Sequence, residues 1–381
     1  MADGRPPWWR RPRKLRRQLA LTLVLVAFVS VATVGTINFY AASRLLDDGT
    51  KESLVGIGES RARRIEDGAT RLVDRVGALA ADLGVVRALS DLSDGFEALG
   101  DEELTAAQNA ELDDFYRIQL IEPLEEADLG SFTTADVSPG SDEGRWLQYH
   151  WTMPLADDPE ARAAVVDAGD GTAYSDAHAA HHGFLSTLAT APGASDLLLV
   201  TSDGDVVYTT NKAVDLGTDL AEGPLSDSNL ATTVLGDLTR VRLGEGVIAD
   251  FALYIPAGAR PTMFVAAAVR DDTEVIGALV VQIPVDALNA ITGADGAWDE
   301  VGLRGGENYV VGGDTLLRSE SRPWIEDPGG YLGKTDDELA RLIELFGSPV
   351  GLQPVATDPV SEALDGRVFE GNARNYLGQR T

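Results

Sequence analysis

The sequence predicts an α+β protein with an N-terminal transmembrane helix, a long extracellular helix and two tandem antiparallel sheet units, the second incomplete. Three observations lead to this prediction: one uncharged apolar run near the N-terminus, a heptad-like apolar pattern after it, and a strand-turn-strand pattern that occurs twice. In chain order we expect a cytoplasmic basic tail (1–18), the membrane helix (19–41), a helical spine (42–128), a membrane-distal unit (129–295) and a truncated membrane-proximal unit (296–381).

The run Leu19–Tyr40 contains no charged residue. About twenty residues at ~1.5 Å rise each cover the ~30 Å hydrocarbon core of a bilayer. Seven Lys and Arg residues precede the run against the single acid Asp3, and this imbalance holds an N-terminus in the cytoplasm. A cleavable signal peptide is the alternative, but its apolar region is only ~7–15 residues long. We therefore expect an uncleaved anchor in the inner or plasma membrane, with residues after about 41 outside.

Composition excludes several classes of protein. The formal net charge is −30, and because the first 17 residues carry +6, the remainder carries −36. A nucleic-acid-binding surface must be basic to displace counterions, so a DNA or RNA partner is not expected. The chain has no cysteine, which excludes disulfides, thiolate zinc sites and cysteine nucleophiles. The apolar fraction of 44% is typical of a folded globular protein.

Two helical stretches are expected after the membrane helix. Apolar residues alternate at steps of four and three on a helix from about 43 to 89, which is typical of a packing seam. The seam consists of Ile65, Ala69, Leu72, Val76, Leu79, Leu83 and Val86. It can pack on the chain's own domain or on a second copy, which would make a homodimer through the long helix. A second helical stretch covers about 101–126.

Five β-prone runs predict the first sheet unit. They are 196–200, 206–210, 247–255, 262–269 and 275–283. Asp203-Gly204 joins the first two as a hairpin turn, because glycine readily adopts the positive φ that such turns need. Helices are expected to cover one face of the sheet. The aromatic segment 145–151 predicts a strand or an extended binding loop, and 284–291 predicts a short helix.

The strand-turn-strand pattern returns at 309–319, with glycine and Asp314 in the turn. An amphipathic helix is expected at 336–346, and 367–376 predicts the start of another strand pair. The chain stops at Thr381 without the final strands of this second unit. We therefore expect this unit to be truncated.

Four stretches carry a resemblance to a known family. They are DLLLVTSDGDVVYTTNKAVDLGTDL (Asp196–Leu220), GPLSDSNLA (Gly223–Ala231), FVAAAVRDDTEVIGALVVQI (Phe264–Ile283) and VGLRGGENYVVGGDTLLRSESR (Val301–Arg322). Together with the preceding helices they resemble the double Cache (dCache) domains, which are PAS-like extracytoplasmic sensors of bacterial transmembrane receptors. The segment 145–151 with Tyr174 and His178 after it is most similar to sensors of adenylate/guanylate cyclases. Chemotaxis receptors and histidine kinases carry similar sensors.

This resemblance implies a homodimeric receptor in which a small ligand in the distal unit shifts the long helix. It also implies a second membrane helix, a HAMP linker and a cytoplasmic output domain. The expected function is small-molecule sensing in bacterial transmembrane signal transduction. A membrane-anchored extracellular enzyme and an adhesive or scaffolding ectodomain are the alternatives.

No catalytic residues, cofactor or metal ligands are predicted. All four histidines lie between 150 and 182, but no H-E-x-x-H motif or spaced carboxylate accompanies them. The segment Gly329–Thr335 ends like a phosphate-binding loop, although Pro328 stands where that loop needs its first glycine. No G-x-S-x-G nucleophile motif occurs.

Eight polar and aromatic residues are the candidate ligand-binding set. In such a set an arginine forms two hydrogen bonds with a ligand carboxylate, an aspartate pairs with a ligand amine, and aromatic rings pack on a cation or an alkyl chain. The set is Arg145, Tyr149, Trp151, Tyr174, His178, Tyr208, Asp250 and Tyr254. The expected ligand is an amino acid, an organic acid or an amine. In the alternative interpretation the aromatics are half-buried sheet residues and Arg145 forms a surface ion pair.

Some Cache receptors recognise amino acids through a tyrosine, an Arg-x-Trp-Tyr segment and an aspartate. Here Arg145 is followed directly by Trp146, with Tyr149 and Trp151 further on. The sequence departs from that pattern, so the resemblance leaves the class of ligand open.

Overall fold

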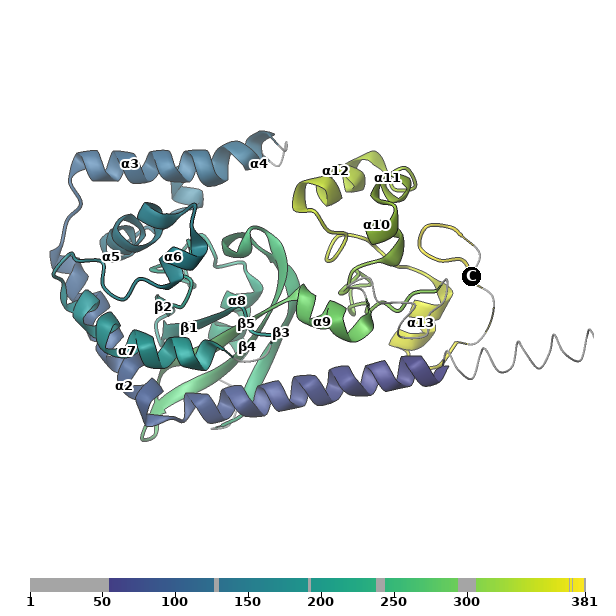
Figure 1. Cartoon of the computed structure of the whole chain (residues 1–381), viewed down its shortest axis with the longest axis horizontal. Coiled ribbons are helices and arrows are strands. Elements are labelled where there is room, and N and C mark those ends of the chain that lie inside the picture. The colour runs from purple at the N-terminus through teal and green to yellow at the C-terminus, as the bar shows by residue number, and fades with distance from the viewer. Residues whose placement is uncertain are drawn as a thin grey trace, which may run out of the picture. The chain divides into compact units, whose positions relative to one another are not determined.

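The computed structural model describes residues 55–126, 130–190, 193–237, 244–293, 306–369, 371 and 373–379 (Figure 1). The chain divides into two compact units, Met1–Ser60 and Arg61–Thr381. Residues 55–60 of the first unit are described, and they are helical. No helix within the described residues is both long and apolar enough to cross a bilayer. The predicted basic tail 1–18 and membrane helix 19–41 lie outside those residues.

The second unit is built around one five-stranded antiparallel sheet with the strand order β2-β1-β5-β4-β3. The strands are β1 (Asp196–Thr201), β2 (Val206–Thr209), β3 (Gly246–Tyr254), β4 (Arg260–Asp271) and β5 (Glu274–Pro284). Between β2 and β3 lie α8 (Asn229–Ala231) and a π-helical turn (Thr232–Asp237). The five predicted strands of this sheet are confirmed.

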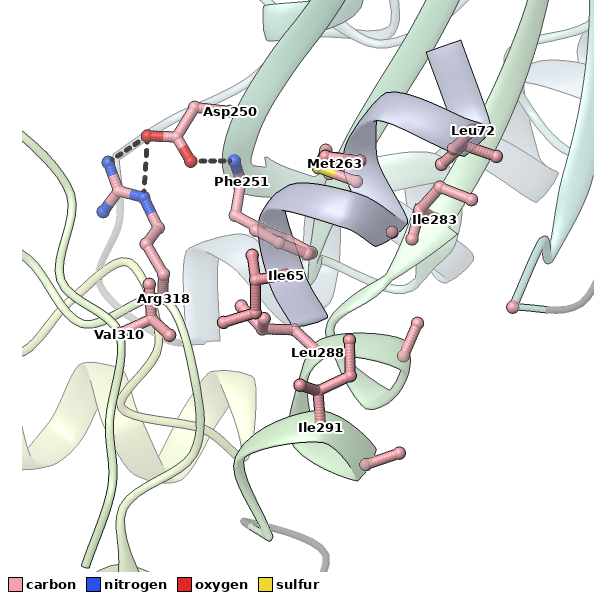
Figure 2. Close-up of a pocket in the computed structure, with 15 residues that line it drawn as sticks. Ile65, Leu72, Asp250, Phe251, Met263, Ile283, Leu288, Ile291, Val310 and Arg318 are labelled. Carbon is pink, nitrogen blue, oxygen red and sulfur yellow. Dashed lines mark hydrogen bonds and ion pairs between the residues drawn. The ribbon is translucent and has the colours of Figure 1, made fainter. Parts of the chain in front are cut away.

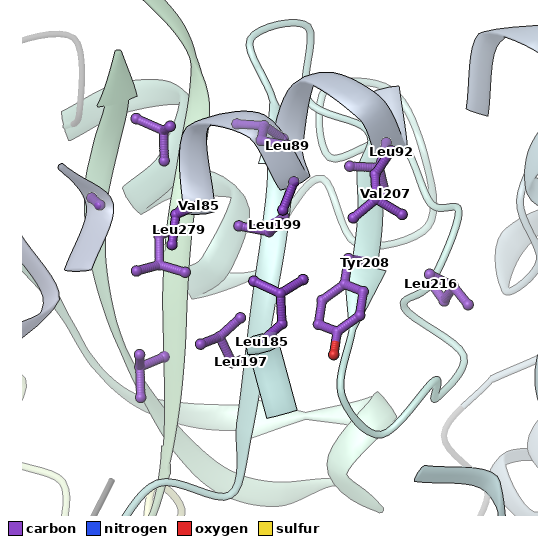
Figure 3. Packing of buried hydrophobic residues seen from close by; sticks show 14 of the residues in the cluster. Val85, Leu89, Leu92, Leu185, Leu197, Leu199, Val207, Tyr208, Leu216 and Leu279 are labelled. Atoms are coloured by element: carbon purple, nitrogen blue, oxygen red, sulfur yellow. The ribbon is translucent and has the colours of Figure 1, made fainter. Parts of the chain in front are cut away.

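One face of the sheet packs on α2 (Leu83–Ala98) and α7 (Ala173–Ala189). Figure 3 shows this core, in which Leu89 of α2 and Leu185 of α7 lie over Leu197 and Leu199 of β1. These residues are fully buried. Burying one leucine side chain contributes roughly 1.5–3 kcal/mol, so this interface is a main source of stability.

The opposite face of the sheet has its own core. Successive strand residues point to opposite faces, so Leu198 and Val200 of β1 turn away from α2 and α7. They pack with Leu230 of α8 and with Val234 of the π-helical turn. Because both faces are covered, β1 consists of consecutive apolar residues rather than alternating ones.

The expected long helix is interrupted. Residues 61–80 are helical, and α2 begins at Leu83 after a break at residues 81–82. The Asp82 side chain caps α2 by accepting a hydrogen bond from the Gly84 N–H at 2.7 Å. Val76 is buried in the core, and Leu72 and Leu79 pack on it. The seam therefore packs on the chain's own domain, and a homodimer through this helix stays a prediction that would use its other faces.

Short helices follow α2. They are α3 (Ala106–Tyr116), α4 (Glu122–Glu126), α5 (Asp142–Leu147) and α6 (Pro159–Ala163). The prediction of a strand or extended loop at 145–151 is wrong, because α5 continues into a π-helical turn over Gln148–Thr152. Ser141 starts this helix by accepting a hydrogen bond from the Gly144 N–H at 3.1 Å.

After β5 the described chain forms helices and tight turns. The helices are α9 (Val285–Thr292), α10 (Arg322–Glu326), α11 (Pro328–Leu332), α12 (Asp337–Phe346) and α13 (Asp358–Leu364). The predicted helices at 284–291 and 336–346 correspond to α9 and α12. Within residues 306–379 as described, the predicted second sheet unit contains isolated bridges, among them Val311–Leu317 and Leu316–Pro354, and no strand.

Candidate functional site

A cavity of about 410 Å³ lies where α6, the N-terminal end of β1, the C-terminal end of β5 and the loop after β2 meet. We call it the polar cavity. Its polar lining residues include Glu160, Arg162, Asp196, Asn211, Asp215 and Gln282. Asp196 and Asp215 are 2% and 1% exposed, so the cavity is lined by two buried carboxyl groups.

Asp196 is the first residue of β1. Its Oδ1 accepts hydrogen bonds from three backbone N–H groups: Leu197 at 2.8 Å, Thr210 at 2.8 Å and Asn211 at 3.2 Å. These bonds tie the loop after β2 to the sheet. Asp215 lies in that loop, and its Oδ2 accepts a hydrogen bond from the Tyr254 hydroxyl at 2.9 Å. Its Oδ1 is buried and has no hydrogen-bond partner among the described groups.

Two buried cations accompany the carboxyl groups. Arg162 of α6 donates from Nε to the Asn211 carbonyl at 2.8 Å. Lys212 is fully buried and donates from Nζ to the carbonyls of Ala163 and Thr210 at 3.1 and 3.2 Å. Both cations thus bond to backbone carbonyls, and within the described part of the chain no ion pair joins them to either carboxylate.

This arrangement changes the proton affinities of the groups. Burial raises the pKa of Asp196, and the nearby Asp215 raises it further. Burial also raises the pKa of Asp215, although the hydrogen bond from Tyr254 opposes that change. Burial lowers the pKa of Lys212 to about 7. The raised pKa values mean that the two carboxyl groups readily bind protons, and a positively charged ligand beside them would favour their ionised form.

Four of the predicted site residues meet elsewhere, in the core between the sheet and α7. The Trp151 ring stands edge-on to Tyr174 at 5.7 Å and lies 4.3 Å from His178. His178 stacks on His182 at 4.7 Å, and the Tyr208 hydroxyl lies 2.9 Å from His182 Nδ1. Burial lowers the pKa of His178 to about 3 and of His182 to about 4. All are buried, so these aromatics are core residues in the described structure.

Arg145 and Tyr149 face α3. Arg145 forms an ion pair with Asp113 at 2.8 Å and donates from Nε to Asn109 at 2.8 Å. The Tyr149 hydroxyl donates to Glu111 at 2.9 Å. Arg145 therefore makes an ion pair of the kind that the alternative interpretation expected.

The last two predicted residues lie on β3. Tyr254 reaches the polar cavity indirectly, through Asp215. Asp250 forms an ion pair with Arg318 at 2.8 Å at the edge of a different, apolar cavity. The eight predicted residues thus lie in four places.

Sequence reasoning missed Arg162, Asp196, Lys212 and Asp215. The segment around Asp196 was interpreted only as a strand, and an acid that precedes an apolar run carries no local sign of burial. One signal was available, because Lys212 and Asp215 lie in the long loop that follows β2, and loops often carry binding residues. Within the described residues no group of three or more His, Asp or Glu side chains is placed to hold a metal ion.

Comparisons with known proteins give remote similarities. No family model matches the chain, and no curated protein matches it. The sensor domain of the V. cholerae histidine kinase DctB is similar at 13% identity and a TM-score of 0.32, covering 71% of this chain and 84% of that one. An extracellular ligand-binding receptor from Desulfohalobium retbaense is similar at 15% identity and a TM-score of 0.28, covering 47% of this chain and 31% of that one.

Proposed function

We propose that this chain is the extracytoplasmic sensing part of a bacterial transmembrane receptor of the double Cache type. In this proposal the compact unit Arg61–Thr381 binds a small cationic or zwitterionic molecule, an amine or an amino acid, in the polar cavity. The helix at 61–80 then passes the signal toward the membrane helix predicted at 19–41. The output domain, whether a cyclase, a kinase or a chemotaxis module, belongs to other parts of the receptor.

The observation that carries this proposal is the polar cavity with its two carboxyl groups. Asp215 is 1% exposed and its Oδ1 has no hydrogen-bond partner among the described groups. Leaving a buried acceptor without a partner costs about 1–3 kcal/mol, so a ligand that donates a hydrogen bond there is stabilised. Arg162 lines the same cavity and supplies a cation for a ligand carboxylate.

The ligand must also distinguish two conformations of the receptor. A ligand shifts such an equilibrium only by its difference in affinity for the two states, typically ~1–3 kcal/mol. The loop 210–215 is suited to this coupling, because Asp196 binds its backbone and Asp215 reaches Tyr254 of β3. A ligand held by Asp196 and Asp215 would therefore act on β1 and β3 together.

A thermal-shift screen of the full chain in detergent tests the proposal, with amines, amino acids, organic acids and purines as ligands. We expect amines or amino acids to raise the unfolding temperature saturably. Asp215→Asn keeps an acceptor for Tyr254 but removes the charge, and we expect it to weaken binding about 10- to 100-fold. Asp203→Asn is the matched control, because Asp203 is exposed and Asn-Gly still favours the hairpin turn.

Each other outcome of the screen contradicts a defined part of the proposal. A ligand whose affinity is unchanged by Asp215→Asn binds elsewhere. A response to organic anions alone contradicts the assignment of a cationic ligand. The absence of any saturable shift favours an adhesive or scaffolding ectodomain, and turnover of a compound favours an anchored enzyme.

A further inference from the structure

We propose that a second cavity of this chain binds a single-chain amphiphile, with an aliphatic body inside and a cationic or hydrogen-bond-donating head beside Asp250. We call it the apolar cavity. It measures about 520 Å³ and lies among residues 65–72 of the helix at 61–80 (the first helix), α9, the middle of β3, the first half of β4, the end of β5 and the segment around Arg318 (Figure 2). This site is separate from the polar cavity, so the proposal does not depend on the function proposed above.

The walls of the apolar cavity are almost entirely hydrocarbon. Ile65 and Leu72 of the first helix face Phe251, Met263 and Ile283 of the sheet, as Figure 2 shows. Such walls form no hydrogen bonds with polar groups of a ligand. They favour the burial of a ligand's apolar surface by about 25 cal/mol per Å².

The first helix leaves this space open through its small residues. Gly68 and Ala69 line the cavity between Ile65 and Leu72 on the same helical face. A Cβ placed on Gly68 would meet no atom within 4 Å. The apolar cavity is therefore present because Gly68 and Ala69 occupy positions at which larger residues would fill the space.

The enclosure and the size indicate a small molecule as the occupant. The walls come from the helix at 61–80, three strands, α9 and the segment around Arg318, so the site is concave rather than a flat face for another protein. An apolar cavity of about 150 Å³ already binds benzene in another protein. The larger cavity here accommodates an alkyl chain of several carbons.

The charged groups at one end determine the preferred head group. Arg318 forms ion pairs with both Asp250 and Asp314 at 2.8 Å, and its Nη1 donates to the Leu316 carbonyl at 3.2 Å. Two carboxylates thus share one guanidinium. Asp250 is the more exposed of the two at 61%, so a donor or a cation can reach it, whereas an anionic head would be repelled.

Arg61 lies near α9 and offers the competing orientation. Its guanidinium donates to the carbonyl oxygen of Ile291, a residue that lines the cavity away from Asp250 in Figure 2. If the head group bound at Arg61, an anionic amphiphile would be preferred. The preference among head groups therefore distinguishes the two orientations.

The cysteine-free chain allows a direct test. A Gly68→Cys variant of the full chain places one thiol at the cavity wall, and its reaction rate with N-ethylmaleimide reports access to the cavity. The probes are octylammonium, 1-octanol and octanoate at equal free concentrations. Ser226→Cys, at an exposed position on the second unit, is the control for effects of the probes on detergent and reagent.

We expect octylammonium to slow labelling of the Gly68→Cys thiol saturably and to leave the Ser226→Cys rate unchanged. 1-Octanol should protect about fivefold less well than octylammonium, and octanoate about 30-fold less well, because one unit of charge at about 4 Å contributes ~1 kcal/mol in water and the two charged heads differ by two units. In a second measurement, an Asp215→Asn background weakens amine binding in the polar cavity; octylammonium should raise the unfolding temperature of that variant, but not after Ala69→Leu, which fills the apolar cavity, is added.

Three results would overturn the proposal. No saturable protection by any probe means that the cavity does not bind amphiphiles. Stronger protection by octanoate assigns the head group to Arg61 and contradicts the placement at Asp250. An unchanged thermal shift when Ala69→Leu is added to the Asp215→Asn background places the probe outside the apolar cavity.

Discussion

Replacing Gly68 by alanine should stabilise the protein. Gly68 lies inside the helix at 61–80, where glycine is roughly 1 kcal/mol less favourable than alanine. The new methyl group would meet no atom within 4 Å, so no steric term opposes this gain. We expect the unfolding free energy to rise by about 0.5–1 kcal/mol, which corresponds to about 1 °C in the unfolding temperature of a unit of this size.

The same substitution at Gly77 is the matched control. Gly77 lies nine residues further along the same helix, but its new Cβ would overlap the carbonyl oxygen of Gly244. A backbone oxygen cannot move aside as a flexible side chain does, so we expect a loss of about 1–3 kcal/mol. Circular dichroism on heating the two purified variants measures both effects. A destabilised Gly68→Ala variant, or a stabilised Gly77→Ala variant, would refute the packing derived for this helix.

Three further predictions test other parts of the structure. Asp82→Ala removes the cap of α2 and should cost about 1 kcal/mol in urea unfolding, whereas an unchanged midpoint would show that the cap is dispensable. Gly312→Ala would push its methyl group against the Arg318 guanidinium and should lower the unfolding free energy by about 1 kcal/mol. If that contact is the cause, the loss disappears in an Arg318→Ala background, and an equal loss there would contradict this account. His178 and His182 have folded pKa values of about 3 and about 4, below the ordinary 6.5, so the unfolded chain binds more protons between those values. Stability should therefore fall as the pH drops from 6.5 toward 4, by up to about 1.4 kcal/mol per pH unit for each histidine. Replacing both by glutamine should flatten the dependence of the urea midpoint on pH, and an equally steep dependence would contradict this account.

Local patterns predicted the sheet well. The expected strands at 247–255 and 275–283 match β3 and β5 to within one residue at each end. Apolar runs bounded by glycine, proline and aspartate predict such strands, because these three residue types favour turns and so mark where the hydrogen bonding between strands ends. The break at Asp82 was not predicted, although an aspartate before an apolar helical segment is a capping signal. At 145–151 the aromatic composition favoured a strand, but Ser141 and two acids in the first turn favour the helix that forms.

The candidate site was harder to predict than the sheet. The polar cavity joins Arg162, Asp196 and Asp215 from three separate segments, and their burial depends on how the loop after β2 folds back. No periodic pattern in the sequence predicts that this loop folds back and buries the three side chains. The predicted aromatics Trp151 and Tyr174 are in contact, and their surroundings are the core. Composition indicates that aromatic side chains cluster, whereas only tertiary structure determines whether the cluster lines a cavity or fills the core.

The two cavities share the end of one strand, and this shared position has a consequence for signalling. Gln282 of β5 lines the polar cavity, and its neighbour Ile283 lines the apolar cavity. Successive residues of a strand point to opposite faces, so a shift at the end of β5 changes both cavities together. β5 also pairs with β1 and β4 over most of its length. Ligands in the two cavities are therefore expected to influence each other's affinity by the same factor in both directions, because coupling between sites is reciprocal. If the affinity for an amine in the polar cavity were independent of 1-octanol bound in the apolar cavity, β5 would not transmit the change.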